Sequence, residues 1–143
     1  MKKRILTWLL AISMLGSLLT VPAGAAAVTK FSDVSDSYTA TAVESLRLMG
    51  VLDGYGDGTF RPENNITRAE FVTLAIKAFY GDSEMMDCDF DDVDKNAWFY
   101  PYVAAANNLG LVQGIGDNQF APNANIVRQD MAVIIKNILD KTG

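Results

Sequence analysis

The sequence of 143 residues contains no histidine and a single cysteine, Cys88. Without histidine the chain has no Ser-His-Asp triad, no Cys-His pair and no metal site with histidine ligands. One cysteine excludes an intramolecular disulfide framework, which leaves either an unused thiol or a bridge to another chain. Composition still allows a carboxylate pair for glycoside hydrolysis. Repeated units take up nearly the whole chain beyond residue 30, however, so we expect a protein that is not an enzyme, with no catalytic residues and no cofactor.

Basic residues are also scarce, because 12 Lys and Arg stand against 17 Asp and Glu. Three of the basic residues lie within residues 1–4, before an uncharged, mostly apolar run over residues 5–19 and the small residues at 23–25. This order is typical of a secretory signal peptide over residues 1–25, cleaved after Ala25. A retained membrane anchor is the alternative, but the apolar run is short for a span of about 20 residues.

Cleavage would remove 25 residues and three positive charges, which leaves 118 residues with a net charge of −8 instead of −5. An acidic exported chain disfavours nucleic acid as a partner, because a phosphate backbone demands a basic face. It also has no membrane contact once the signal peptide is gone. Any anionic ligand must therefore be held by a few well-placed cations.

Beyond residue 30 the chain contains two copies of one unit. Residues 50–79 align with residues 110–139 at an offset of 60, and nine of the thirty pairs are identical. These pairs are Gly50/Gly110, Gly54/Gly114, Gly56/Gly116, Asp57/Asp117, Phe60/Phe120, Pro62/Pro122, Asn65/Asn125, Ile66/Ile126 and Arg68/Arg128. A fixed offset of this kind indicates an internal repeat. We assign a connector at 26–30, repeat 1 at 31–80, a linker at 81–89 and repeat 2 at 90–140.

Each repeat is expected to fold as two helices joined by a glycine-rich loop. The spacing of apolar residues predicts a first helix over 39–49 in repeat 1. Thr67 and Glu70 form a capping box that starts the second helix, a structural role, whereas Val127 in repeat 2 cannot cap its helix, at a cost of about 1 kcal/mol. Pro101 is tolerable only in the first turn of a helix.

A helix pair of this size cannot bury its own apolar face, so the repeats must pack on each other. The predicted fold class is therefore mostly α, with tandem helix-loop-helix repeats.

The motifs of repeat 1 resemble S-layer homology repeats. The resemblance rests on four elements in this order: the opening Phe31-Ser32-Asp33-Val34, an aromatic residue at Tyr38, the loop from Gly50 to Pro62, and the box Ile66-Thr67-Arg68-Ala69-Glu70. It covers both repeats, although repeat 2 is the weaker match, with the box Ile126-Val127-Arg128-Gln129-Asp130.

The resemblance implies a module that holds exported proteins on the bacterial cell wall or S-layer without a covalent bond. It implies as partner a secondary cell-wall polysaccharide, in some cases pyruvylated, or another peptidoglycan-linked polymer. In this family three repeats usually assemble into a pseudo-threefold helical domain with grooves between neighbours, whereas two repeats are recognised here. The alternatives are a structural module that pairs with other chains bearing such repeats, and a truncated fragment.

Arg68 and Arg128 are the first candidate ligand residues. The resemblance associates the arginine of the box with the anionic sugar, and a guanidinium group matches a carboxylate with paired donors at a helix N-terminus. The alternative is that each arginine pairs with a carboxylate of its own fold, such as Asp57 or Asp117.

The other candidates for glycan contact are Trp98 and Tyr38, whose rings can stack on sugars, and the loop residues Gly114, Gly116 and Asp117. We expect the main groove between the repeats, with Arg68 and this loop facing it and Trp98 beside it. No metal site is expected, because the acidic stretches that begin at residues 53 and 87 both fail the EF-hand ligand spacing.

Overall fold

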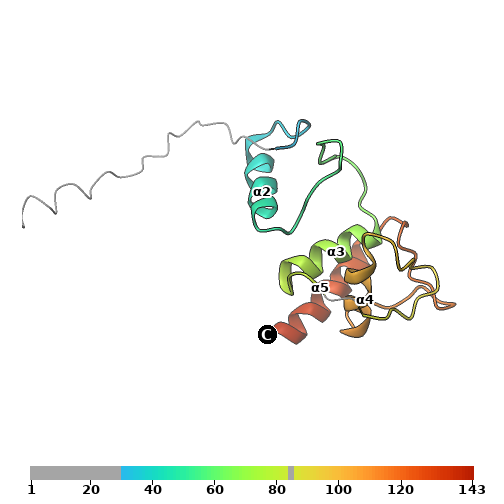
Figure 1. Ribbon diagram of the computed structural model, residues 1–143. Helices are drawn as coiled ribbons and strands as arrows, with labels where there is room; N and C mark the ends of the chain where they lie inside the picture. Colours follow the sequence, from blue (N-terminus) through green and yellow to red (C-terminus); the bar gives the residue numbers. More distant parts are fainter. Residues whose placement is uncertain (1–29, 84–85) are drawn as a thin grey trace, which may run out of the picture.

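The computed structural model describes residues 30–83 and 86–143. The predicted signal peptide and most of the connector lie outside the described residues. These residues form four helices, in two helix-loop-helix units (Figure 1): α2 (Ser37–Leu48), α3 (Arg68–Phe79), α4 (Tyr100–Asn108) and α5 (Arg128–Thr142). Within the described ranges there is no strand, only two isolated bridges. The predicted class, mostly α with tandem helix-loop-helix repeats, is confirmed.

The helix starts follow from local sequence. The Thr67 hydroxyl accepts from the Glu70 N–H group and the Glu70 carboxylate accepts from the Thr67 N–H group, so the capping box of α3 is present as predicted. No side chain caps α5, whose N-cap is Val127. Pro101 lies in the first turn of α4. The first helix starts two residues earlier than predicted, because the Asp36 carboxylate caps it.

An aspartate fastens the glycine-rich loop in each repeat. The Asp33 carboxylate accepts from the N–H groups of residues 60 and 61, at 2.8 and 2.7 Å. The Asp92 carboxylate does the same for residues 120 and 121, at 2.8 and 2.7 Å. Residue 61 and residue 121 both have positive φ, of 59° and 57°, so the paired hydrogen bonds offset an unfavourable backbone conformation. The aspartate of the Phe-x-Asp-Val opening thus has a structural role.

The two repeats share one core. Helix α3 of repeat 1 packs against α4 and α5 of repeat 2. The core buries Ala69, Val72, Ala75 and Ile76 from α3 with Tyr100, Val103, Leu111, Phe120, Ile134 and Ile138 from repeat 2. A smaller cluster joins α2 to the opening of repeat 1, through Phe31, Val34, Ala40, Val43 and Leu52. The expectation that the repeats pack on each other is confirmed.

A search of the described helices for a membrane span finds none that combines the required length and apolar character.

Candidate functional site

Arg68, the first residue of α3, is buried between the two repeats and is only 6% exposed. Its Nη1 forms an ion pair of 2.7 Å with Asp130 of α5. Its Nε donates to the Phe120 carbonyl at 2.9 Å, and its Nη2 donates to the Gln113 carbonyl at 3.2 Å. The guanidinium group also lies 4.9 Å from the centroid of the Phe120 ring. All of these partners belong to repeat 2, so Arg68 joins the repeats.

Backbone hydrogen bonds beside Arg68 reinforce this junction. The N–H groups of Arg68 and Ala69 donate to the carbonyls of residues 124 and 122, at 2.9 and 3.0 Å. In the opposite direction, the Ile126 N–H group donates to the Ile66 carbonyl at 3.1 Å. The first two N–H groups of α3 are therefore satisfied by the loop of repeat 2, and the third, that of Glu70, donates to the Thr67 hydroxyl, as the end of a buried helix requires.

A shallow hollow of about 410 Å³ lies beside Arg68; we call it the Arg68 hollow. It is lined by Arg68, Leu111, Val112, Gln113, Gly114, Ile115, Asp130, Val133 and Ile134. The structure thus brings together Arg68 and Gly114, two of the residues predicted to face a common groove.

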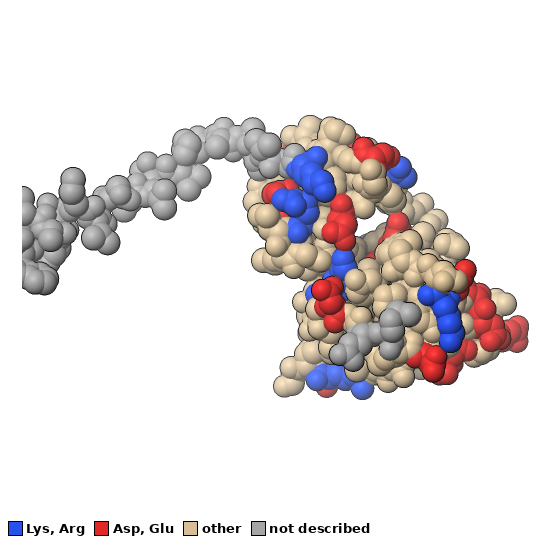
Figure 2. Space-filling view, in the orientation of Figure 1, with Lys and Arg blue, Asp and Glu red and all other residues tan. Residues whose placement is uncertain are grey.

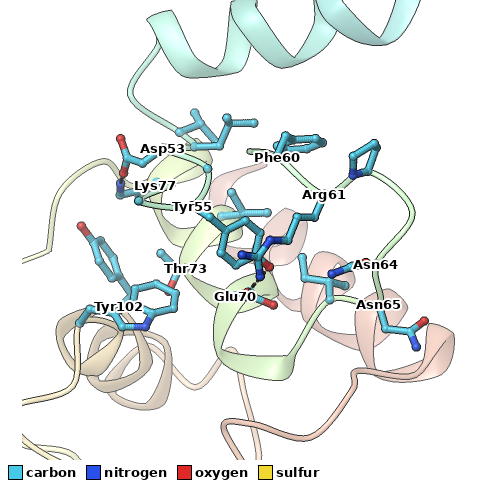
Figure 3. Close-up of a pocket in the computed structure, with 18 residues that line it drawn as sticks. Asp53, Tyr55, Phe60, Arg61, Asn64, Asn65, Glu70, Thr73, Lys77 and Tyr102 are labelled. Carbon is cyan, nitrogen blue, oxygen red and sulfur yellow. Dashed lines mark hydrogen bonds and ion pairs between the residues drawn. The ribbon is translucent and has the colours of Figure 1, made fainter. Parts of the chain in front are cut away.

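A larger cleft of about 730 Å³ opens between the loop of repeat 1 and the first helix of repeat 2; we call it the interrepeat cleft (Figure 3). One side is formed by the loop from Val51 to Ile66, the floor by α3, and the opposite side by Trp98 and Tyr102. Trp98 is 61% exposed, so most of its ring is accessible.

The charged side chains of the interrepeat cleft are all paired. The Arg61 guanidinium lies 4.0 Å from the centroid of the Tyr55 ring and forms an ion pair of 2.8 Å with Asp57. Hydrogen bonds from the side chains of Thr59 and Arg61 lower the pKa of Asp57 to about 2. The Tyr55 hydroxyl donates to Glu70 at 2.9 Å, and this bond raises the pKa of Tyr55. Arg61 reaches across the ring of Tyr55 in Figure 3.

Lys77 supplies a second cation to the same cleft, on the side of α4. It forms an ion pair of 2.8 Å with Asp53, and its Nζ lies 5.6 Å from the centroid of the Tyr102 ring. Burial lowers the pKa of Lys77, but the hydrogen bond to Asp53 and the electrostatic attraction of Asp53 and other nearby acidic groups together more than offset this, so the pKa is raised overall. Thr73, between these groups, is 6% exposed, and its Oγ1 has no hydrogen-bond partner in the part of the chain that the structure describes.

The remaining predicted residues lie apart from both sites. Tyr38 is 85% exposed at the start of α2 and lines neither cavity. Gly116 and Asp117 are exposed at the tip of the loop of repeat 2, both with positive φ. Arg128 is exposed at the start of α5 and makes no ion pair or hydrogen bond through its side chain within residues 30–83 and 86–143. Arg68 pairs with Asp130 rather than with Asp57 or Asp117.

The residues of the cleft that were not selected from the sequence include Arg61, Lys77 and Tyr55. Their counterparts at the offset of 60 are Ala121, Asn137 and Ile115, so the comparison of the repeats gave them no weight. The sequence does place Tyr55, Asp57 and Arg61 within one tight loop, and this was the signal that could have indicated a cluster of interacting side chains there.

On the face shown in Figure 2, Lys and Arg are interspersed with Asp and Glu and form no continuous basic patch. The described residues contain no group of three or more His, Cys, Asp or Glu that could hold a metal ion.

The described residues thus form a pair of helical repeats with a cleft between them that is lined by aromatic rings and paired charges. The family model of the S-layer homology domain matches residues 30–72 and 89–132, which fall on the two repeats. The chain belongs to the S-layer homology domain family. The resemblance of the motifs to this family is thereby confirmed.

The curated relatives are much longer proteins. The chain is 33% identical over 131 residues to the surface-layer 125 kDa protein of Lysinibacillus sphaericus, covering 92% of this chain and 11% of that protein. It is 31% identical over 117 residues to a cellulosome-anchoring protein of Acetivibrio thermocellus, covering 78% and 26%. It is 36% identical over 121 residues to an amylopullulanase of Thermoanaerobacterium thermosulfurigenes, covering 80% and 6%. The chain thus spans only a small part of the length of these relatives.

Proposed function

We propose that this chain is a non-covalent anchor that binds an anionic secondary cell-wall polysaccharide, or another peptidoglycan-linked polymer, in the interrepeat cleft. The observation that carries the proposal is the composition of this cleft. It presents the rings of Tyr55, Trp98 and Tyr102 together with the cations Arg61 and Lys77. Aromatic rings offer flat apolar faces for sugar rings, and cations match acidic groups on the same polymer.

Each side of the cleft would make a different contact. Trp98 is exposed and stands at the rim, where it can stack on a sugar ring without a change in the fold. Lys77 is already held by Asp53 and the Tyr102 ring, so its position is fixed before the ligand arrives. A carboxylate on the ligand, such as a ketal-linked pyruvate, could then replace the exposed Asp53 as its partner.

Thr73 offers a further argument for a ligand at this place. A buried hydroxyl without a partner is unfavourable, and such groups are uncommon in folded proteins. Thr73 is one of the residues that line the cleft, but its Oγ1 has almost no exposed surface, so a hydrogen bond to a sugar hydroxyl would require the Thr73 side chain to turn toward the cleft.

The residues chosen from the resemblance remain predicted ligand contacts. Arg68 and Gly114 line the Arg68 hollow, which is the second place where a sugar could bind. Tyr38, Arg128, and the loop residues Gly116 and Asp117 are exposed and accessible to an extended polymer. Because Arg68 also joins the repeats, an Arg68 variant tests folding and binding together. Trp98 is therefore the better residue for a first test.

The decisive measurement is cosedimentation with purified cell-wall sacculi, before and after chemical removal of the polysaccharide. We expect the protein to sediment only with untreated sacculi. Trp98→Ala should weaken binding about tenfold, equivalent to about 1.4 kcal/mol. When Lys77→Gln is combined with Trp98→Ala, binding to sacculi should weaken further and should depend less on the salt concentration. Tyr80→Ala, which removes a partly exposed ring outside the cleft, is the matched control.

Binding that survives Trp98→Ala and Lys77→Gln in a folded protein would contradict the cleft as the site. Equal sedimentation with stripped and untreated sacculi would contradict a polysaccharide ligand.

The chain itself is proposed to be non-catalytic. The amylopullulanase that it matches shares only 6% of its length with this chain, so most of that enzyme lies outside the shared part. The proposal predicts no hydrolysis of wall polysaccharide by the purified protein, measured as release of reducing sugar.

A further inference from the structure

The interrepeat cleft and the Arg68 hollow are the same site in two copies of the repeat. Every residue that repeat 2 contributes to the Arg68 hollow has a counterpart, sixty positions earlier, in the lining of the interrepeat cleft. The pairs are Val51/Leu111, Leu52/Val112, Asp53/Gln113, Gly54/Gly114, Tyr55/Ile115, Glu70/Asp130, Thr73/Val133 and Leu74/Ile134. In repeat 2 this site holds an arginine from the other repeat, whereas in repeat 1 it holds none.

The acceptors that receive Arg68 have counterparts in repeat 1. The carbonyls of Gln113 and Phe120 correspond to those of Asp53 and Phe60, which accept no hydrogen bond from the described residues. The Asp130 carboxylate corresponds to Glu70. Glu70 accepts three hydrogen bonds, from Tyr55 and Thr67. A carboxylate has about four acceptor positions, so one remains for another donor. We call these three groups of repeat 1 the open acceptor site.

The donor that corresponds to Arg68 is Arg128, the first residue of α5. Its side chain is exposed and has no partner among the described residues. The backbone repeats the same contrast. The N–H groups of residues 68 and 69 donate to the loop of repeat 2, whereas those of residues 128 and 129 donate to no described group outside their helix. Because the first N–H groups of a helix have no partner within it, this end of α5 lacks the acceptors that α3 has.

The helix faces differ in the same way. Val72 and Thr73 of α3 are buried, whereas their counterparts Ala132 and Val133 of α5 are exposed, Val133 by 54%. Helix α3 packs against α4, the first helix of repeat 2. The corresponding first helix of repeat 1 is α2, where Leu46 is 40% exposed although its counterpart Ala106 is buried. An apolar face on α5 and one on α2 are therefore left without the contact that joins α3 to α4.

We propose that a second copy of this chain docks head to tail, with Arg128 of one copy inserted into the open acceptor site of the other. Helix α2 of the receiving copy then packs on α5 of the donating copy, as α4 packs on α3 within one chain. The occupied site in repeat 2 supplies the template, including its charge complementarity. The smallest closed assembly in which every donor and acceptor is used is a dimer, in which each chain donates once and accepts once.

The test is the molecular mass of the purified protein by light scattering over a range of concentrations, under reducing conditions that exclude a bridge through Cys88. We expect two chains per particle, and an Arg128→Ala variant that associates at least tenfold more weakly. Lys141→Ala removes a positive charge from the last turn of the same helix, at the position that corresponds to the exposed Gly81, and should leave the mass unchanged. A wild-type protein that stays monomeric at its highest soluble concentration overturns the proposal.

A mixing experiment tests the head-to-tail geometry. Arg128→Ala keeps the open acceptor site, and Glu70→Gln weakens that site while a glutamine can still complete the capping box. Either variant alone should be largely monomeric, and an equal mixture should form heterodimers through the one intact contact. A dimer that Arg128→Ala leaves intact, or a mixture that stays monomeric, overturns the proposal.

Wall binding separates this proposal from the proposed function. Trp98→Ala should bind sacculi about tenfold more weakly and keep the dimer. If no sacculus binding is found in a protein that forms the expected dimer, the proposed function fails and the head-to-tail contact stands.

Discussion

Repeat 1 and repeat 2 each possess the part of the binding site that the other lacks. In repeat 1 the cleft is bounded by Trp98 and Tyr102 from the neighbouring repeat but receives no arginine from another repeat. In repeat 2 the site holds Arg68 but has no helix on its far side in the described chain. If both cavities belong to one kind of binding site, as we propose, a complete site would need a repeat with a neighbour on both sides, one that supplies an arginine and one that supplies an aromatic helix.

The largest expected difference between the repeats concerns their equivalent phenylalanines. Phe120 is fully buried in the shared core and lies under Arg68, whereas Phe60 is only partly buried. Phe120→Ala should lower the free energy of unfolding by about 3–5 kcal/mol, the usual cost of a large cavity in a core. Phe60→Ala should cost clearly less, because less of its ring leaves water on folding. Urea unfolding measures both, and equal losses would contradict the shared core.

The two arginines of the boxes should differ almost as much. Arg68→Ala leaves Asp130 and two carbonyls without their donor, which should lower the free energy of unfolding by about 3 kcal/mol. That is the low end for a broken buried pair, because Asp130 is 35% exposed. Arg128→Ala, measured at a protein concentration too low for association, should change stability by less than about 0.5 kcal/mol. A similar cost for both would mean that the junction does not depend on Arg68.

An exchange of capping residues tests the difference between α3 and α5. Val127→Thr gives α5 the hydroxyl that α3 has at Thr67 and should stabilise the protein by about 1 kcal/mol. The reciprocal Thr67→Val should cost about the same. Thermal unfolding followed by circular dichroism gives both values. A gain from Val127→Thr that fails to appear would show that the first turn of α5 is satisfied in another way.

The smallest expected effect is the response to low pH. We expect the glycine-rich loop of repeat 1 to respond more strongly than the loop of repeat 2. The pKa of Asp57 is lowered to about 2, by Thr59 first, and that of Asp33 is lowered chiefly by the Phe60 N–H group. A lowered folded pKa stabilises the fold above the unfolded pKa of about 3.9, and this contribution is lost as the pH falls toward 2. Amide NMR signals of Thr59 and Phe60 should therefore shift between pH 4 and 2. In Asp57→Asn the shift at Thr59 should largely disappear, and its persistence would contradict the assignment.

Much of the fold could be predicted, because its signals are local in the sequence. The capping box at Thr67, the apolar stripe that follows it and the position of Pro101 each depend on residues a few positions apart. These features predicted the type and order of the helices. The two-residue error at the start of α2 arose because Asp36 was not recognised as its N-cap.

The site was harder to predict, because an offset of 60 pairs equivalent residues without showing which copy they contact. Arg68 pairs with Asp130, 62 residues away, and not with the aspartates of the glycine-rich loops that were considered as its partners. In the alignment of the two repeats Lys77 is paired with the neutral Asn137, so the repeat pattern did not indicate that Lys77 is part of a cleft. Only the packing of α3 on α4 places Lys77 near the Tyr102 ring. These contacts depend on tertiary structure and leave little trace in either repeat alone.

The placement of α3 has one further consequence, for how the protein would respond to a protease. Helix α3 belongs to repeat 1 by sequence, yet most of its apolar side chains lie in the core that it forms with α4 and α5. A single backbone cut between residues 83 and 86 would therefore leave two peptides that remain bound to each other. The cut protein would then keep its size in solution without an intact backbone between the repeats. Only electrophoresis in a denaturing detergent would separate the two peptides and reveal the cut.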